Sequence, residues 1–351
     1  MKIAIDISRL QSGHKARGTG VYVRELLTAL TKLGGKHTFF IVNVGQKVPD
    51  DADLVHYPYF DPFLLTLPIM KPKPTVVTVH DLIPLVFPQQ FPKGVRGSVK
   101  WQFQRLSLGG SRRIITDSHA SKTDIQRIIP FDGERIDVIP LAASSNFRPI
   151  SDKLVLDRVR KKYRLPETFI LYVGDINWNK NVLGLLEAYS LCMSKNVSPR
   201  PALVLVGSSF LNEEIPEVTE INKRIESLNI KHLIVRPGYV PDEELAALYC
   251  QAVCLIQPSK YEGFGFPILE AMASGCPVLS SNASSLAEIA GPASSFEPND
   301  SEGIVSNLTA VLTLTKKQRQ QVIQKGIAWS KQFTWQKVAR ATIDSYQKAL
   351  T

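Results

Sequence analysis

The sequence lacks any apolar run approaching the roughly 20 residues that a bilayer-spanning helix needs. It also lacks the zones of a signal peptide at its start, where Met1–Asp6 instead predicts the beginning of a strand. These two features favour a cytoplasmic protein. Of the 351 residues, 44% are hydrophobic, which is typical of a globular chain with room for two domains.

Cysteine is scarce, and its four positions do not have the spacing of a metal or redox site: Cys192, Cys250, Cys254 and Cys276. We expect free thiols in buried positions. Asp51 and Asp53 form an Asp-x-Asp pair of the kind that can hold a metal ion. They fall in a polar loop before a strand, where a turn or a cap is expected instead. The sequence therefore predicts no metal site.

Acidic residues are few in the first half of the chain. Residues 1–150 contain 20 Lys and Arg against 12 Asp and Glu, whereas the remainder has 22 against 20. A basic first half suits an anionic partner, such as a membrane surface or a phosphate-bearing acceptor, although it can also be a general property of a basic chain. Nucleic acid is disfavoured, because the basic residues are scattered and no recognised binding motif is present.

Short apolar runs, most of them β-branched, alternate with stretches of helical periodicity along the whole chain. The strand-like runs are Lys2–Ile7, Thr38–Val44, Leu54–Tyr57, Thr75–Val79, Arg113–Thr116, Ile136–Ile139, Phe169–Val173, Ala202–Val206, Leu233–Arg236 and Val253–Ile256. This alternation predicts an α/β protein with parallel sheets covered by helices on both faces. An irregular stretch at 140–149 places a domain boundary near Ile150, which gives domains of residues 1–150 and 151–334. The final stretch, Trp335–Leu350, is expected to be a helix with Thr334 as its N-cap.

The stretch 253–277 combines a strand, a glycine-rich turn and a short helix. Gly263 and Gly265 allow the backbone to approach a ligand closely, and the N–H groups of the following helix start offer a seat for an anion or for sugar oxygens. Glu262 and Glu270 flank this turn, so their carboxylates are candidates to hold polyol hydroxyls. Alternatively, Glu270 only complements the helix dipole and Glu262 is a solvated loop residue.

A second glycine motif, Gly18-Thr19-Gly20, follows the first strand and precedes an amphipathic helix, Val21–Leu33. A strand, a glycine loop and a helix form the layout that cradles phosphates. A nicotinamide-dependent oxidoreductase would need the full Gly-x-Gly-x-x-Gly fingerprint with an acidic residue about twenty positions on, and no strand–turn–helix unit here supplies it.

His80 and Asp81 come directly after the strand Thr75–Val79, at the end where parallel sheets bind ligands. We expect Asp81 to fix the imidazole tautomer and His80 to contact a sugar hydroxyl. The alternative is a histidine that is merely capped into a loop.

The basic stretch Lys93–Gly110 predicts a helix in which Trp101 and Phe103 lie among lysines and arginines. Such a helix either lies on a membrane surface or is solvated with an apolar inner face.

The run Glu262-Gly-Phe-Gly-Phe-Pro-Ile-Leu-Glu270-Ala-Met-Ala-Ser-Gly-Cys-Pro-Val resembles the Glu-x7-Glu signature of the retaining family-4 glycosyltransferases. The resemblance implies the GT-B fold, with two Rossmann-like, doubly wound parallel-sheet domains facing a cleft. It also implies that Glu270 holds the ribose hydroxyls of a nucleotide sugar. The donor sugar would be held by Glu262 and by the turn residues Gly263, Phe264, Gly265 and Phe266.

Other segments resemble further parts of this family. The His80-Asp81 segment is similar to that of mannosyl- and rhamnosyl-transferring members, in which the histidine approaches the donor sugar. Gly18 and Gly20 correspond to a loop that faces the donor phosphates and the acceptor. Tyr239 and Val240 match a segment whose backbone meets the nucleotide base.

Residues 174–181 resemble the family segment whose arginine and lysine neutralise the donor diphosphate. Lys180 matches the lysine, but Asp175 occupies the arginine position, and an acidic side chain cannot take that role. Arg9 and Arg17 are candidates to replace it.

The resemblance implies a retaining hexosyltransferase that needs neither a cofactor nor a metal, with His80 and Glu262 positioning the sugar. GDP-mannose is the favoured donor and a UDP-sugar the second choice. The acceptor would be a glycan or a lipid-linked hydroxyl at the cytoplasmic face of a membrane, to which the protein binds peripherally. The C-terminal helix at 335–351 would pack back on the first domain. Because of Asp175, a non-catalytic nucleotide-sugar-binding protein remains an alternative.

Overall fold

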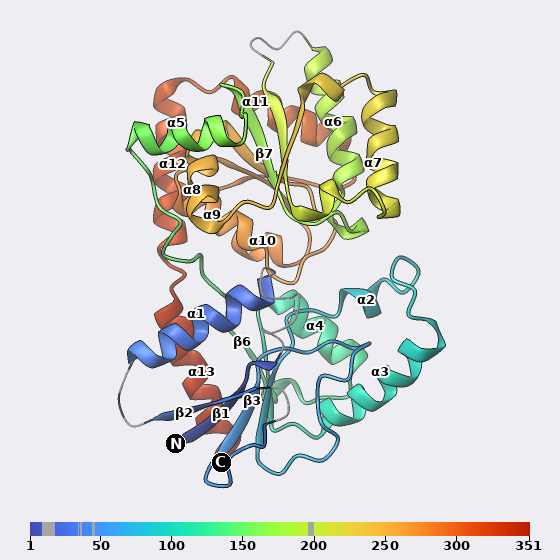
Figure 1. The fold of residues 1–351 in the computed structure, drawn as a ribbon, viewed down its shortest axis with the longest axis vertical. Coiled ribbons are helices and arrows are strands. Elements are labelled where there is room, and N and C mark those ends of the chain that lie inside the picture. The colour runs from blue at the N-terminus through green and yellow to red at the C-terminus, as the bar shows by residue number, and fades with distance from the viewer. Residues whose placement is uncertain (9–17, 34, 36, 44–45, 196–199) are drawn as a thin grey trace. The chain divides into compact units, whose positions relative to one another are not determined.

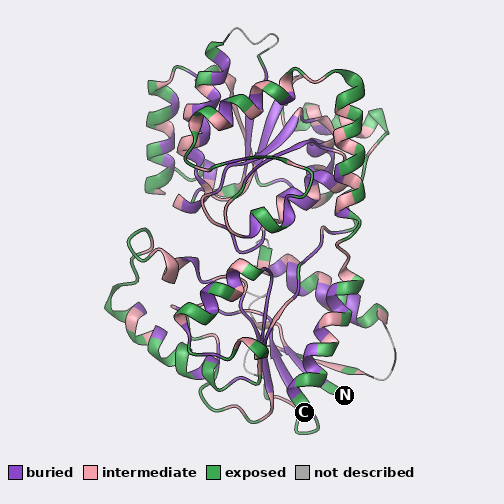
Figure 2. Cartoon of the chain, turned by 180° about the vertical axis from the view of Figure 1, so that it is seen from behind, coloured by how far each residue is buried: buried purple, intermediate pink, exposed green. Residues whose placement is uncertain are grey.

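The computed structural model describes residues 1–8, 18–33, 35, 37–43, 46–195 and 200–351, and it divides into two compact units (Figure 1). The first unit consists of Met1–Ala142 and Phe333–Thr351, and the second of Ala143–Gln332. This boundary lies slightly before the one near Ile150 that the sequence predicts. Both units are α/β structures in which buried residues concentrate on the strands and on the inner sides of the helices (Figure 2).

Within the described residues, the first unit contains a six-stranded parallel sheet in the order β2-β1-β3-β4-β5-β6. Its strands are β1 (Lys2–Asp6), β2 (Thr38–Val42), β3 (Leu54–Tyr57), β4 (Thr75–Thr78), β5 (Arg113–Thr116) and β6 (Ile136–Val138). The chain runs from β1 outward to β2 and then returns to the other side of β1 for β3. This reversal of direction creates a switch point at β1 and β3, and in open α/β sheets ligands bind outside the carboxyl ends of the strands at such a point.

Helices cover both faces of this first sheet. They are α1 (Gly18–Leu33), α2 (Ile83–Val86), α3 (Gly94–Gly109), α4 (His119–Ile128) and α13 (Trp335–Leu350). Successive strand residues point to opposite faces, so Val55 and Val77 meet Trp101 of α3 in one core. On the other face, α1 and α13 lie against each other (Figure 1). Thr334 caps α13 by accepting a hydrogen bond from the Lys337 amide, as predicted.

Within the described residues, the second unit repeats the plan with the parallel order β12-β11-β10-β7-β8-β9. Its strands are β7 (Phe169–Val173), β8 (Ala202–Val206), β9 (Ile234–Gly238), β10 (Cys254–Gln257), β11 (Val278–Ser281) and β12 (Ser294–Phe296). Its helices are α5 (Lys153–Lys162), α6 (Val182–Ser194), α7 (Pro216–Ser227), α8 (Asp242–Gln251), α9 (Phe266–Ala273), α10 (Ser285–Ile289), α11 (Ser301–Leu312) and α12 (Lys316–Ser330). Here the switch point lies between β7 and β10, which pair in register at Leu171 and Leu255.

The structure differs from the expectations at two places, the glycines that begin α1 and the thiol of Cys250. Gly18, Thr19 and Gly20 are not a loop but the first three residues of α1. The entropic cost of glycine applies mainly to helix interiors, whereas these two glycines lie in the first turn. No helix in the described part of the chain is long and apolar enough to cross a membrane. All four cysteines are free thiols, and Cys250 is only partly buried.

Candidate functional site

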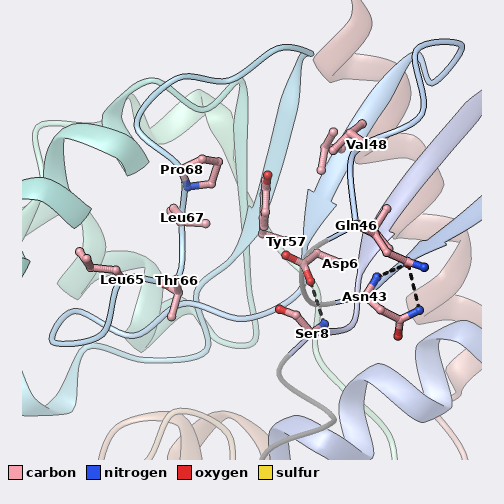
Figure 3. A pocket seen from close by; sticks show the side chains of 12 residues that line it. Asp6, Ser8, Asn43, Gln46, Val48, Tyr57, Leu65, Thr66, Leu67 and Pro68 are labelled. Atoms are coloured by element: carbon pink, nitrogen blue, oxygen red, sulfur yellow. Dashed lines mark hydrogen bonds between the residues drawn. The ribbon is translucent and has the colours of Figure 1, made fainter.

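A cavity of about 460 Å³ lies at the carboxyl ends of β1, β2 and β3 in the first unit (Figure 3). Its polar wall includes Asp6, Asn43 and Tyr57, and its apolar wall includes residues 65–68 of the loop after β3. Asp6 accepts a hydrogen bond from the Ser8 amide at 2.8 Å. The cavity thus occupies the switch point of its sheet, with a carboxylate and a phenol available for hydroxyl groups.

His80 lies just beyond β4, and its partner is Asp117, just beyond the adjacent strand β5. His80 Nδ1 is 2.7 Å from Asp117 Oδ2, and both side chains are largely buried. Burial alone would lower the pKa of His80, but the Asp117 charge and hydrogen bond outweigh it, so the pKa lies above its usual value. Burial raises the pKa of Asp117, and the His80 charge offsets part of that rise. The contact fixes the imidazole tautomer and orientation.

This arrangement corrects the expected role of Asp81. The Asp81 carboxylate accepts a hydrogen bond from the Ile83 amide at 3.0 Å and so caps the turn that starts α2. Asp117 takes the orienting role instead, because β4 and β5 are neighbours and their carboxyl ends share one edge of the sheet. Asp117 directly follows the strand β5, and this position could have marked it as a candidate. A single sequence does not show, however, that β5 is the neighbour of β4.

A buried chain of hydrogen-bonded side chains lies next to His80 in the interior of the first unit. The Tyr22 ring packs edge-on against the imidazole, with the ring centroids 4.7 Å apart. The Tyr22 hydroxyl is 3.0 Å from Thr78 Oγ1, which is 2.8 Å from His56 Nε2. His56 Nδ1 lies 2.7 Å from the Tyr346 hydroxyl, and burial lowers the pKa of His56 to about 3, so this imidazole is neutral. The chain ties α1, β4, β3 and α13 together behind His80.

Gly18 and Gly20 lie at the N-terminus of α1, and Arg9 and Arg17 lie outside the described residues. If the two glycines contact a phosphate, as predicted, they do so through the amides of a helix N-terminus and not through a loop. The contact stays a prediction.

In the second unit, β10 leads through the glycine turn into α9. Gly265 has φ of +108°, and a Cβ atom there would lie 2.5 Å from Leu286 Cδ2, so only glycine fits. At the other end of α9, the Gly275 amide donates to the Met272 carbonyl and the Cys276 amide to the Ala271 carbonyl. This is a Schellman motif, with Gly275 at φ of +79°. Gly265 thus determines where α9 begins, and the Schellman motif determines where it ends.

Glu262 and Lys180 form a close ion pair at this switch point. Lys180 Nζ lies 2.8 and 2.7 Å from the two Glu262 carboxylate oxygens. Ser259 Oγ and Gln257 Nε2 also donate to Glu262 Oε1, at 2.7 and 3.1 Å. Only 8% of the Glu262 side chain is exposed. Glu262 is therefore neither a solvated loop residue nor an open carboxylate at the mouth of the turn, but the centre of a buried polar cluster.

The segment that carries Lys180 is fastened to the loop after β10 by its two asparagines. Asn179 Nδ2 donates to the Tyr261 carbonyl at 2.9 Å, and Asn181 Nδ2 to the carbonyls of Pro258 and Pro298. Asn181 adopts a left-handed conformation with φ of +56°. These bonds draw the segment out of the helix, so α6 begins at Val182 and Lys180 ends a short 3₁₀ turn, Trp178–Lys180.

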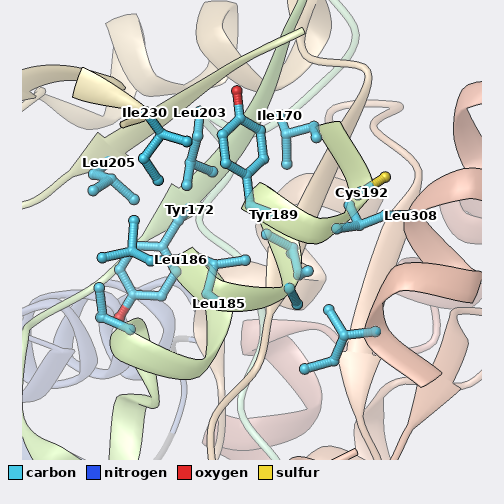
Figure 4. Packing of buried hydrophobic residues seen from close by; sticks show 14 of the residues in the cluster. Ile170, Tyr172, Leu185, Leu186, Tyr189, Cys192, Leu203, Leu205, Ile230 and Leu308 are labelled. Carbon is cyan, nitrogen blue, oxygen red and sulfur yellow. The ribbon is translucent and has the colours of Figure 1, made fainter. Parts of the chain in front are cut away.

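Asp175 sits at the end of β7 above the core of the second unit, part of which Figure 4 shows. The hydroxyl of the core residue Tyr172 donates to the Asp175 carbonyl at 2.6 Å. Asp175 Oδ1 accepts from Ser209 Oγ at 2.7 Å and from the Ile176 amide at 2.9 Å. The carboxylate therefore ties the loop after β7 to the loop after β8.

Glu270 lies in α9 and accepts a hydrogen bond from the Tyr249 hydroxyl of α8 at 3.0 Å. Burial raises the pKa of Glu270 to about 8, the Tyr249 hydrogen bond offsets part of that rise, and the Asp242 charge adds to it. The side chain is therefore mostly protonated at neutral pH without a ligand. Tyr249 was not identified from the sequence, where nothing distinguishes it from a core tyrosine.

The remaining predicted donor residues differ in exposure. Tyr239 is 56% exposed just after β9, whereas Val240 and Phe264 are buried. The rings of Phe264 and Phe266 pack edge-on with their centroids 5.4 Å apart. Among the residues that the structure describes, no group of three or more His, Cys, Asp or Glu side chains is arranged to hold a metal ion.

Comparison with known proteins gives two family matches. Residues 157–329 match the model of glycosyl transferases group 1, and residues 46–144 match that of glycosyltransferase family 4. The O-antigen chain mannosyltransferase B of Escherichia coli is 34% identical over 276 residues, which are 78% of this chain and 70% of that protein. The serotype-specific mannosyltransferase WbdA of the same species is 26% identical over 83% of this chain, but the match spans only 35% of WbdA.

Solved structures with the same fold include two proteins of low sequence identity. A sucrose-phosphate synthase from Thermosynechococcus elongatus has a TM-score of 0.75 and 19% identity, with 99% of this chain and 98% of that chain covered. Anabaena HepE in complex with UDP and glucose has a TM-score of 0.75 and 17% identity, with 99% of each chain covered. The chain therefore belongs to the family-4 glycosyltransferases and has their GT-B fold.

Proposed function

We propose that this glycosyltransferase moves a mannosyl unit from GDP-mannose to a hydroxyl of a glycan or lipid-linked acceptor, with retention of configuration and without a metal. The observation that carries the donor side is the Lys180–Glu262 cluster at the β7/β10 switch point, beside the N-terminus of α9. An amine and helix amides suit the diphosphate of a nucleotide sugar, and a carboxylate suits the hydroxyl groups of its sugar. The choice of mannose follows the mannosyltransferase relatives.

In this proposal, Glu270 receives the ribose hydroxyls, and the segment of Tyr239 and Val240 meets the base. Lys180 and the start of α9 stabilise the charge that develops on the leaving GDP. Glu262 and His80 position the mannosyl ring, together with the turn at Gly263–Phe266. Gly18 and Gly20 offer the amides of the α1 start to the diphosphate.

This chain has Asp175 where the family has an arginine that neutralises the donor diphosphate. We propose that Lys260 supplies the missing positive charge. Its amide donates to the Asn179 carbonyl at 2.7 Å, so its segment runs beside that of Lys180. Its ammonium lies 5.0 Å from the centroid of the Trp178 ring. A lysine held in this way adds positive charge beside Lys180 without an ion pair to a described carboxylate.

For the acceptor, we propose the cavity at the carboxyl ends of β1, β2 and β3. Asp6 and Tyr57 in its wall suit sugar hydroxyls, and Leu65 and Leu67 suit an apolar ring face or linker.

Calorimetric titration with GDP, UDP, ADP and dTDP, with magnesium or with EDTA, tests the donor. GDP is expected to bind at least tenfold more tightly than the others with either addition, and GDP-mannose to be hydrolysed slowly without acceptor. A preference for UDP would mean that the donor is a UDP-sugar, as the UDP complex of HepE suggests for that protein. Loss of binding in EDTA would contradict metal independence. Tight binding without hydrolysis or transfer would indicate a non-catalytic binding protein, and failure of all four nucleotides would end the proposal.

Replacing Asp117 with asparagine is expected to lower turnover about tenfold to a hundredfold, because the amide still accepts from His80 but carries no charge. The pKa of His80 should fall, measured by NMR titration, and the pH–rate profile should shift with it. A histidine whose folded-state pKa is raised stabilises the fold below about pH 6.5, and this contribution is lost as the pH rises through the raised value. The stability difference between wild type and D117N should therefore shrink with rising pH. Asp81→Asn serves as the control, and equal effects of both variants would contradict the assignment.

A further inference from the structure

Exposed apolar side chains gather on one part of the first unit. Among the described residues, eight large hydrophobic side chains in the loop after β3 and in α3 are at least a third exposed: Leu64, Leu65, Ile69, Met70, Val95, Val99, Phe103 and Leu106. Met70 is 86% exposed and Val95 is 83% exposed. Single exposed hydrophobics are ordinary, but a concentration in two neighbouring segments marks an interaction surface.

Helix α3 has a buried face and, roughly opposite to it, an exposed apolar face. Its buried face packs on the sheet and consists of Gly97, Trp101, Gln104, Ser107 and Leu108. At 3.6 residues per turn, the exposed apolar residues fall within an arc of about 80° on roughly the opposite side: Val95, Val99, Phe103 and Leu106. The expectation of a solvated helix with an apolar inner face therefore describes only half of it. Figure 2 shows exposed residues along the length of this helix.

The loop and the helix form one fixed surface. The buried Gln104 side chain accepts from the Thr66 and Leu67 amides at 3.0 and 3.2 Å and donates to the Leu67 carbonyl at 3.3 Å. Ser107 Oγ donates to the Pro68 carbonyl, and Lys71 Nζ lies 3.0 Å from Ser107 Oγ. The backbone of the loop is thus held against α3, so little backbone ordering is needed on binding.

The charges on this surface are predominantly positive, although Asp61, which accepts a hydrogen bond from the Leu64 amide at 3.0 Å, borders the loop. Residues 64–106 contain six lysines and arginines and a single acid, Asp81. Four of the basic residues belong to α3 or directly precede it: Lys93, Arg96, Lys100 and Arg105. None of these four makes an ion pair with a residue that the structure describes. Their charge is available to an anionic partner.

We infer that α3 and the loop at 64–70 form a docking surface for an anionic lipid bilayer. A soluble polyanion would use the cations but leave eight apolar side chains in water, whereas the interface of a bilayer satisfies both. The inference builds on the proposed lipid-linked acceptor. Residues 65–68 line the cavity at the carboxyl ends of β1–β3, so the same loop that meets the bilayer borders the proposed acceptor site.

Flotation with vesicles of phosphatidylcholine, with or without 30% phosphatidylglycerol, tests the surface. Wild type is expected to float with the anionic vesicles. The apolar variant V95S/V99S/F103S should lose at least tenfold in partitioning, because three exposed apolar side chains that would enter the bilayer interface are replaced by serine. The charge variant R96Q/K100Q/R105Q should lose the preference for phosphatidylglycerol. The matched control, K316Q/K317Q on exposed positions of α12, should float like wild type.

Two outcomes would overturn the inference: no flotation of wild type, or flotation of the apolar variant equal to wild type, which would indicate attraction of a basic protein by charge alone. Phe103→Trp adds a direct readout, because its fluorescence should be quenched by brominated phosphatidylglycerol. Hydrolysis of GDP-mannose without lipid is expected to be unchanged in every variant, so failure of docking and failure of the proposed transferase activity are distinguishable.

Discussion

Lys180→Met is expected to lower the free energy of unfolding of the second unit by about 2–3 kcal/mol and turnover about a hundredfold. The stability loss arises because Glu262 would remain buried without its cation, held only by Ser259 and Gln257. The loss of turnover arises because the charge on the leaving diphosphate loses a fixed ammonium. Urea unfolding, followed by hydrogen exchange in peptides from β7 and β10, measures the first effect, and steady-state kinetics at a temperature where the variant is folded measures the second.

The double variant K180M/E262Q separates the two roles. Removing both charges leaves a hydrogen-bonding amide beside an apolar chain, so most of the stability should return while turnover stays low. Lys260→Ala is the matched control in the neighbouring segment, and it should lower turnover with little change in stability. If K180M lost activity only in proportion to its unfolded fraction, Lys180 would be a structural lysine.

The strands could be predicted from the sequence where apolar, β-branched runs are bounded by polar residues. Phe169–Val173 and Ala202–Val206 have the bounds that their runs predicted, because central parallel strands are buried on both faces. The helix Trp335–Leu350 was also predicted with its cap. Local signals sufficed in these places, since each run carries its own pattern.

The environments of the candidate site residues could not be predicted in this way. Glu262 is buried because Lys180, 82 residues earlier in the chain, meets it across the switch point. Asp117, and not the adjacent Asp81, orients His80, because strand order decides which loops share an edge. A pattern along the chain identifies the residue types of a site. The partner that sets each charge state depends on topology, which a single sequence does not show.

The second prediction with a large expected effect is that the affinity for GDP-mannose depends on pH through Glu270. With its pKa raised to about 8 in the free protein, Glu270 is expected to be mostly protonated at pH 7. Ribose hydroxyls donate hydrogen bonds and so favour the carboxylate, which means that donor binding should release close to one proton at pH 7. The affinity for GDP-mannose should accordingly rise about ninefold from pH 6 to pH 7 and about fivefold from pH 7 to pH 8, and level off above. GDP-mannose is preferred to GDP here, because it has no terminal phosphate that titrates near pH 6.

Calorimetry at pH 7 in buffers of different ionisation enthalpy measures the released proton directly, as the slope of the observed binding enthalpy against the buffer enthalpy. Glu270→Gln should abolish the slope and weaken binding roughly tenfold to a hundredfold, because hydrogen bonds to a charged acceptor are replaced by neutral ones. The Tyr249 hydroxyl can still donate to the glutamine oxygen, so the fold of this region should persist. Tyr249→Phe should move the midpoint of the pH dependence upward, because that hydroxyl favours the carboxylate.

The same pKa shift fixes the sign of a stability effect. A carboxyl whose folded-state pKa is raised from 4.5 to about 8 stabilises the fold below pH 4.5, and this contribution is lost as the pH rises through 8. Wild type should therefore lose stability relative to E270Q between pH 5 and pH 8, and bound GDP-mannose should reverse the trend. Tight binding of GDP-mannose with no proton release would contradict the assignment, since hydrogen bonds from both ribose hydroxyls favour the carboxylate over the protonated carboxyl.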